Sequence, residues 1–151
     1  LAISALGSDL GSPFGRGRGG PGGWWFLFEP ELHLGADVLV PDLAAWRRER
    51  LPSPTGPFLA VAPDWICEAL SPATARVDRV EKLRVYAREG VEHVWILDPA
   101  ARTLEVLARD GQPWRLLGTW ADDERVRAPP FDVLELELAA LWAPRSPEAP
   151  S

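Results

Sequence analysis

Residues 63–72 read Pro-Asp-Trp-Ile-Cys-Glu-Ala-Leu-Ser-Pro, and this stretch decides the fold. Its centre, residues 65–70, is a short apolar run typical of a buried strand. The strand has to end by Pro72, because proline donates no N–H to a sheet ladder. A helix is predicted to follow over residues 74–89 and to end at Gly90, since glycine readily adopts the left-handed conformation that closes many helices. The unit is therefore a buried strand that leads directly into a long helix.

Further strands are predicted on both sides of this unit. Upstream, residues 24–32 and 36–44 are rich in aromatic and branched side chains. Downstream, a strand over residues 91–97 precedes a hairpin with arms at 103–108 and 114–120, joined around an Asp-Gly pair. The order of strands, one long helix and more strands predicts an α/β (α+β) fold, with a mixed β-sheet flanked by helices. A helical bundle or a β-sandwich does not fit this order.

The composition is that of one globular domain. The chain has 151 residues, of which 46% are hydrophobic and 25% charged, both ordinary values for a folded domain. We expect a domain over residues 1–142, with a Gly-rich loop at 11–23, and a disordered Pro-rich tail at 143–151. The sequence contains no Met, so we expect it to begin inside a longer gene product, with the domain truncated at its N-terminus.

Cysteine usage and charge limit the classes of function. Cys67 is the only cysteine, which excludes an internal disulfide and a multi-cysteine metal cluster and suits the cytoplasm. No apolar run is long enough to cross a membrane, and no signal-peptide pattern opens the chain. The formal net charge of −6 provides no overall basic field. Contact with nucleic acid would therefore need local arginine clusters or metal ions.

Two carboxylates are predicted to share strand faces with apolar side chains. Strand alternation groups Asp42 with Val38 and Val40, and it groups Glu68 with its apolar neighbours two residues away on either side. A carboxylate in such surroundings costs free energy unless it is paired or binds a cation. Two of them on neighbouring strands provide the oxygen ligands that Mg²⁺ or Mn²⁺ prefers. The alternative is that both lie at frayed strand ends and face water.

The predicted helix carries a polar stripe. Asp78, Lys82 and Tyr86 follow at a spacing of four, so all three lie on one side of the helix. Lys82 is the only lysine in a chain whose other basic residues are arginines. Because a lysine ammonium is a compact charge with a tunable pKa, its survival indicates that an ammonium is needed there. The alternative is an ordinary ion pair with an aromatic neighbour.

The linked motifs carry a resemblance to a known family. They are Glu-Pro-Glu-Leu-His-Leu-Gly at 29–35, Val-Pro-Asp-Leu-Ala at 40–44, the stretch at 63–72, the stretch from Asp78 to Val91, and Trp-Ile-Leu-Asp-Pro at 95–99. Together they resemble the Uma-two family of predicted bacterial restriction endonucleases, within the PD-(D/E)XK nuclease superfamily. The resemblance covers about residues 22–110. It implies a restriction-endonuclease-like core that hydrolyses phosphodiester bonds in DNA with a divalent metal, Mg²⁺ or Mn²⁺.

The resemblance also implies roles for particular residues. Asp42 matches the superfamily aspartate and Glu68 the second acidic ligand, so both are expected to bind metal and act in catalysis, with Glu31 as a further ligand. This sequence departs from the superfamily pattern two residues after the acidic ligand, where Leu70 replaces a lysine. Lys82 of the helix is expected to supply the missing ammonium, as the third catalytic residue.

Supporting residues and partners follow from the same hypothesis. Asp78 is expected to orient the lysine, and Tyr86 to fix the helix or contact the substrate. Arg47, Arg48 and Arg50 are expected to reach DNA phosphates, with a solvated loop as the alternative. Cleavage of both strands with one site per chain favours a homodimer.

A second function class stays open from the sequence. The chain could be a catalytically inactive nuclease-fold module that binds a protein or nucleic-acid partner. The acidic net charge and the eight tryptophans support this reading. Trp24, Trp25 and Trp46 would form an exposed interaction patch in that case, or fill the core in the other.

Overall fold

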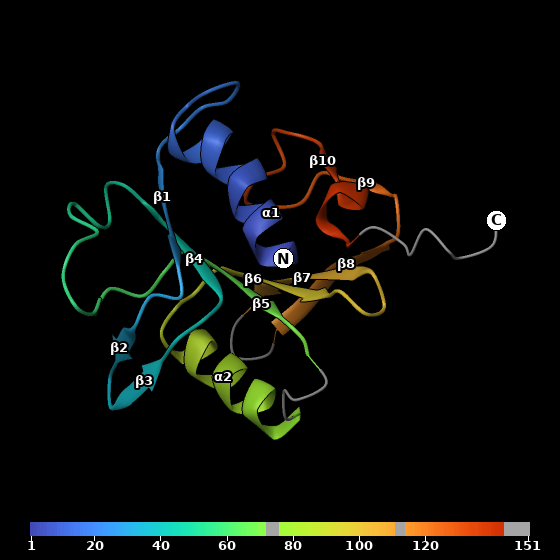
Figure 1. The fold of residues 1–151 in the computed structure, drawn as a ribbon. Helices are drawn as coiled ribbons and strands as arrows, with labels where there is room; N and C mark the ends of the chain where they lie inside the picture. Colours follow the sequence, from blue (N-terminus) through green and yellow to red (C-terminus); the bar gives the residue numbers. More distant parts are fainter. Residues whose placement is uncertain (72–75, 111–113, 144–151) are drawn as a thin grey trace.

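A six-stranded mixed sheet forms the centre of the molecule (Figure 1). The computed structural model describes residues 1–71, 76–110 and 114–143, with only the backbone of 76–78. Its sheet strands, in spatial order, are β1 (Trp24–Phe28), β4 (Leu43–Arg47), β5 (Trp65–Ala69), β6 (His93–Asp98), β7 (Thr103–Arg109) and β8 (Trp114–Ala121). β5 and β6 pair in parallel, and the other neighbours pair antiparallel. The predicted α/β (α+β) class with a mixed sheet is confirmed.

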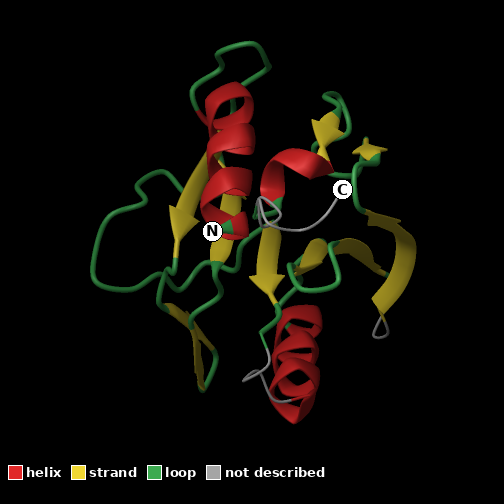
Figure 2. Ribbon diagram, turned by 45° about the vertical axis from the view of Figure 1, so that its right-hand side comes forward, coloured by secondary structure: helices red, strands yellow, loops and turns green. Residues whose placement is uncertain are grey.

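One helix covers each face of the sheet (Figure 2). Helix α1 (Ala2–Leu10) packs on the face that includes Trp65 and Cys67, and helix α2 (Arg76–Arg88) packs on the face that includes Ile66. Alternation along β5 thus feeds two separate apolar cores. Because β5 and β6 are parallel, the chain must cross over between them, and α2 makes that connection.

Short elements complete the fold around this sheet. They are a wide helical turn η1 (Gly11–Gly15), the antiparallel pairs β2 (Leu32–Leu34) with β3 (Asp37–Leu39) and β9 (Arg125–Val126) with β10 (Leu136–Glu137), and the 3-10 turn η2 (Leu138–Leu141). The predicted Gly-rich loop therefore begins with one helical turn. The predicted disordered tail lies almost entirely outside the described residues. Within the described residues, no helix is long and apolar enough to cross a membrane.

The prediction of single strands over 24–32 and 36–44 was wrong. Glu29 adopts a positive φ of 48°, which turns the chain, and Pro41 has no N–H to offer a ladder. Each stretch is therefore divided, and β2 and β3 form a hairpin of their own. Val38 lies in that hairpin and is 60% exposed, so it does not share a buried face with Asp42.

The burial of three tryptophans decides between an exposed aromatic patch and a core position, the two alternatives that the sequence left open. Trp24 and Trp46 are buried, at 5% and 0% exposure. Trp25 is half-buried, and its indole N–H donates to the Leu51 carbonyl at 2.8 Å. The three residues therefore serve mainly to fill the core, and the proposed aromatic interaction patch is not formed.

Candidate active site

Two acidic residues meet where β4 and β5 pair. The antiparallel register sets Leu43 opposite Cys67, so Asp42, one residue before β4, lies opposite Glu68 in β5. Alternation turns Cys67 into the α1-side core and Glu68 toward α2. The two acids therefore lie side by side where β4 and β5 pair, although Asp42 directly precedes its strand instead of lying within it.

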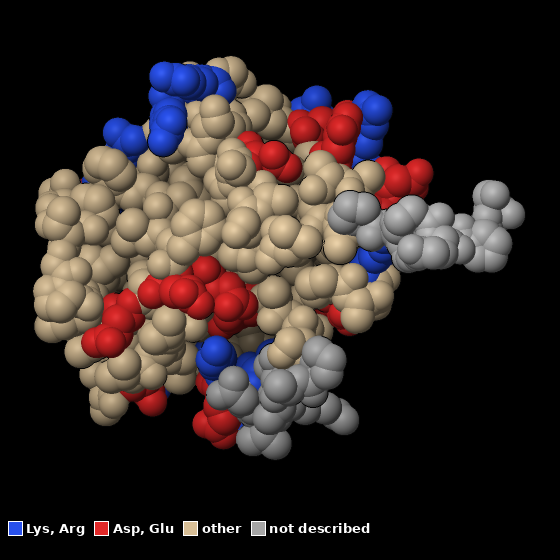
Figure 3. Space-filling model, in the orientation of Figure 1, with Lys and Arg blue, Asp and Glu red and all other residues tan. Residues whose placement is uncertain are grey.

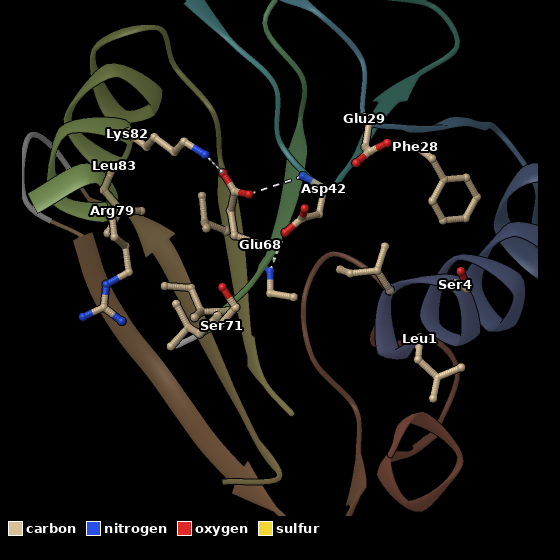
Figure 4. A pocket seen from close by; sticks show the side chains of 15 residues that line it. Leu1, Ser4, Phe28, Glu29, Asp42, Glu68, Ser71, Arg79, Lys82 and Leu83 are labelled. Carbon is tan, nitrogen blue, oxygen red and sulfur yellow. Dashed lines mark hydrogen bonds and ion pairs between the residues drawn. The ribbon is translucent and has the colours of Figure 1, made fainter. Parts of the chain in front are cut away.

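The two acids hold each other through the backbone (Figure 4). The Asp42 N–H donates to Glu68 Oε1 at 3.3 Å. In return, Asp42 Oδ2 accepts the Ala69 N–H at 2.7 Å. An ionised carboxylate has about four acceptor sites, so these bonds fix both groups while leaving acceptor capacity for a ligand.

Helix α2 brings two polar groups to Glu68 from the other side. The Tyr86 hydroxyl donates to Glu68 Oε2 at 3.0 Å, and Lys82 Nζ lies 3.5 Å from the same oxygen. Tyr86 is fully buried, whereas the Lys82 side chain is 28% exposed. The predicted position of Lys82 above the strand ends is confirmed. Asp78, the third residue of the stripe, has a side chain outside the described residues.

The surroundings of Glu68 oppose its ionisation. Burial raises the pKa of the Glu68 carboxyl, and the charge of Asp42 raises it further. Lys82, the Tyr86 hydroxyl and the Asp42 N–H act in the opposite direction and lower this pKa. The net result is a pKa above the ordinary value. Additional positive charge at this point would favour the ionised form of both acids.

Asp42, Glu68 and Lys82 line a cleft of about 820 Å³. The first turn of α1, the end of β1 and helix α2 form its walls, and Figure 4 shows Asp42, Glu68 and Lys82 facing the open space. Glu29 also lines the cleft, as do Ser71 and Arg79. The cleft therefore places acidic oxygens beside two cations, among apolar walls.

Glu31 does not take the place that the family resemblance implied. It does not line the cleft, and its carboxylate pairs with His33 Nε2 at 2.8 Å. The reason is the positive φ at Glu29, which redirects the chain before β2. Glu29 lies at the cleft instead, and the sequence pattern held no signal for that turn beyond the following proline.

Arg47, Arg48 and Arg50 also lie away from the cleft. β4 runs from the position after Asp42 to Arg47, so these arginines lie at its opposite end. Arg50 is ion-paired to Asp64 at 2.9 Å. The cation that sequence reasoning missed is Arg79. Its position three residues before Lys82, on the same side of the helix, was the available signal.

The donor set suits a hard divalent cation. Among the described residues, no three His, Cys, Asp or Glu side chains gather as a complete metal-binding group. Mg²⁺, however, is commonly held by one or two carboxylates together with waters and substrate phosphate oxygens. Asp42 and Glu68 offer that pair of oxygen donors. By contrast, the thiol of Cys67 is buried with a strongly raised pKa and faces the other core, so it offers neither a ligand nor a nucleophile.

Comparisons with known proteins identify the fold and the family of the chain. A solved structure titled as a putative nuclease belonging to DUF820, from Anabaena variabilis ATCC 29413, superposes with a TM-score of 0.72 at 22% identity, covering 94% of this chain and 80% of that one. That likeness shows the fold. No curated protein gives a significant match. The family model Uma2, described as "Putative restriction endonuclease", matches residues 7–140. Because that match spans most of the chain and includes both acids of the cleft, the chain belongs to the Uma2 family.

Proposed function

We propose that this protein is an endonuclease that hydrolyses phosphodiester bonds in DNA, with Mg²⁺ or Mn²⁺ held by Asp42 and Glu68. The observation that carries the proposal is the mutual fixation of these two carboxylates at a cleft, with the Lys82 ammonium beside them. Membership of the family supports a nuclease in general terms. The metal and the DNA substrate belong to the proposal.

Each residue of the cleft has a chemical task in this scheme. When bound, the divalent metal lowers the pKa of a water and polarises the phosphate. Asp42 and Glu68 provide the negative charge that attracts the cation. Lys82 donates to the attacking water or to the phosphate oxygens as their charge grows, because its ammonium already lies at the acidic pair. Tyr86 holds Glu68 in place through its hydroxyl.

Arg79 is the residue that best fits the phosphate itself. It lines the cleft, and Figure 4 marks no hydrogen bond or ion pair between its guanidinium and the other residues drawn. Lys82, one helical turn away, already faces Glu68. A planar guanidinium matches phosphate oxygens in a bidentate manner. We therefore assign Arg79 to the phosphate that enters the cleft.

The test is plasmid cleavage over a panel of divalent metals. Asp42→Asn and Glu68→Gln should each lower the rate by more than the ~10–100-fold that loss of an outer-shell partner costs. The matched control is Asp37→Asn. Asp37 lies in strand β3 of the hairpin, and its half-exposed carboxylate is paired with Arg88 of helix α2. Wild type and control should cut with Mg²⁺ or Mn²⁺ and not in EDTA. Cleavage that survives in Asp42→Asn would refute the proposal.

Metal binding has a readout that does not depend on activity. Mn²⁺ at about 100 times its Kd should stabilise the wild-type fold by about 2.7 kcal/mol, measured as a rise in Tm. Asp42→Asn should lose this rise, and Asp37→Asn should keep it.

One observation favours the alternative of a catalytically inactive binding module. Glu68 is already paired with Lys82 and Tyr86, and the described residues contain no third acidic ligand beside it in a metal-binding group. An inactive module would show no thermal stabilisation by Mn²⁺ and no cleavage with any metal. The two experiments above therefore separate the two functions.

A further inference from the structure

A cluster of arginines lies at the end of the sheet remote from the cleft. We call it the arginine platform, and its exposed members are Arg16, Arg18, Arg47, Arg48 and Arg50. The first two lie on the loop that leads into β1, and the others lie at and after the end of β4. Figure 3 shows basic side chains over that loop, on the same face as the acidic cleft. In a chain of net charge −6, this is a marked local concentration of positive charge.

Two members of the platform are stacked on tryptophans. The Arg47 guanidinium lies 4.5 Å from the centre of the Trp24 ring, and that of Arg48 lies 4.1 Å from the Trp25 ring. Stacking on an aromatic face orients a guanidinium and reduces the side-chain entropy that a contact would cost. The Arg48 guanidinium already donates from Nε to the Trp24 carbonyl at 3.2 Å and from Nη2 to the Gly15 carbonyl, which leaves its remaining N–H groups to donate to a ligand. The platform is therefore partly organised before any ligand arrives.

The glycine loop is fixed to the same platform. Arg48 donates from its guanidinium to the Gly15 carbonyl, and the Arg18 N–H donates to the Ser12 carbonyl at 2.9 Å. The first bond holds the loop against the end of β4, and the second closes the loop on itself. Hydrogen bonds therefore fix the backbone of the loop that carries Arg16 and Arg18, while the side chains of both residues remain exposed.

Little negative charge is available within the platform to neutralise it. Among the residues that the structure describes, Arg50 is the only member of the platform that forms an ion pair, and its partner is Asp64. Glu49 is the only acidic residue between Arg47 and Arg50. Five guanidinium groups against two carboxylates leave a surplus suited to a polyanion. Guanidinium groups held in fixed planes suit the phosphate oxygens of a nucleic acid better than they suit a diffuse lipid surface.

We propose that the arginine platform binds the phosphate backbone of duplex DNA beside the segment that enters the cleft. β1 and β4 connect the two places, because Trp24 pairs with Arg47 at the platform end and Phe28 pairs with Leu43 at the cleft end. The four residue steps from Trp24 to Phe28 span about 14 Å, which is about four base pairs of B-DNA at about 3.4 Å each. One duplex lying along this edge of the sheet reaches both places.

This inference rests on the proposed function in one respect, which is that the substrate of the cleft is the same DNA duplex that the platform binds. The platform itself contacts phosphates only, so it positions DNA without reading its sequence. It also gives the enzyme a one-sided footprint, with the strong contacts on one flank of the bond that is cut.

The experiment measures duplex binding in EDTA, where no cleavage is expected. Fluorescence anisotropy with a labelled duplex of about 20 base pairs, between about 50 and 200 mM salt, gives the slope of log Kd against log salt. Arg16→Gln/Arg18→Gln should reduce that slope by about 1.8, which corresponds to two lost phosphate contacts at about 0.9 each. The control Arg84→Gln/Arg115→Gln removes the same charge from exposed positions on α2 and β8 and should leave the slope unchanged.

Each outcome bears on one proposal. An unchanged slope in the platform variant, with an active nuclease, overturns the platform and leaves the proposed function. A reduced slope in a protein that cuts no DNA with any metal overturns the proposed function and leaves the platform. If the platform variant instead loses binding to phosphatidylserine vesicles while its DNA slope is unchanged, the surface belongs to a membrane and the inference is wrong.

Discussion

Glu68 is the single residue on which the cleft depends most. It receives a backbone N–H, a phenol and an ammonium, although its side chain is only 14% exposed. Burial still raises the pKa of its carboxyl, so these partners offset the loss of water only in part. A buried acid in this condition gains most from a cation, and it marks a functional site more reliably than an exposed acid does.

His93 provides a test of pH dependence at the residue scale. Burial lowers the pKa of His93, and the nearby charge of Arg47 lowers it further, against the opposing effect of Glu92. As pH falls below the unfolded value of about 6.5, the unfolded chain binds a proton that the folded protein does not. The free energy of unfolding should therefore decrease as pH falls from about 7.5 through the lowered pKa.

Urea unfolding of the wild type and His93→Gln over that range measures the effect. The variant should lose the part of the decline that this histidine causes. The same pH dependence in both proteins would show that other groups are responsible.

Among single residues, the sequence predicted the two acids and the ammonium but not all of the residues that lie beside them in the cleft. Glu68 follows from strand alternation and Lys82 from helix spacing, and the backbone obeys both, whereas the alternation that pointed to Asp42 is broken at Pro41. Glu29 could not be chosen over Glu31, because the choice depends on one positive φ. A backbone torsion of that kind is set by tertiary contacts rather than by residue type.

At the scale of elements, helix α2 is the part that positions the cleft's cations. It ends at Arg88, and Gly90 follows with a φ of 86°, a conformation that costs other residues about 1–2 kcal/mol. A Cβ at Gly90 would meet nothing within 4 Å. Any effect of Gly90→Ala therefore comes from the backbone alone.

We expect Gly90→Ala to lower the Tm by about 2–4 °C for each kcal/mol lost. Gly11→Ala is a matched control, because a Cβ there also meets nothing within 4 Å and its φ is −65°. Differential scanning calorimetry should show a decrease only in the first variant. Equal Tm values in the two variants would mean that the strain at Gly90 is absorbed elsewhere.

Elements were predictable where one physical signal dominated. β5, α2 and the β7–β8 pair were found from apolar runs, helix spacing and turn residues. The two upstream stretches failed because alternation continues through Pro41 in the sequence, although the ladder does not. The predicted helix start at residue 74 and the predicted turn between β7 and β8 lie outside the described residues, so those two boundaries stay predictions.

Asp42 and Glu68 provide one proposed cutting site in each chain, and a DNA duplex has two strands. We therefore expect two copies to act together, related by a two-fold axis. Analytical ultracentrifugation should show a dimer in the presence of duplex DNA. Supercoiled plasmid should be converted to linear product with a rate that rises more steeply than enzyme concentration. A monomer that produces only nicked circles would contradict this prediction.

The reciprocal bonds between the two acids have a consequence for how the site can change over time. Each carboxylate anchors the main chain at or beside the other, so loss of one also loosens its neighbour. The pair therefore behaves as a single inherited unit, with a coupling energy that separate substitutions cannot divide between its members. A lineage that abandons the chemistry should lose both acids in quick succession, and it should rarely keep one of them alone.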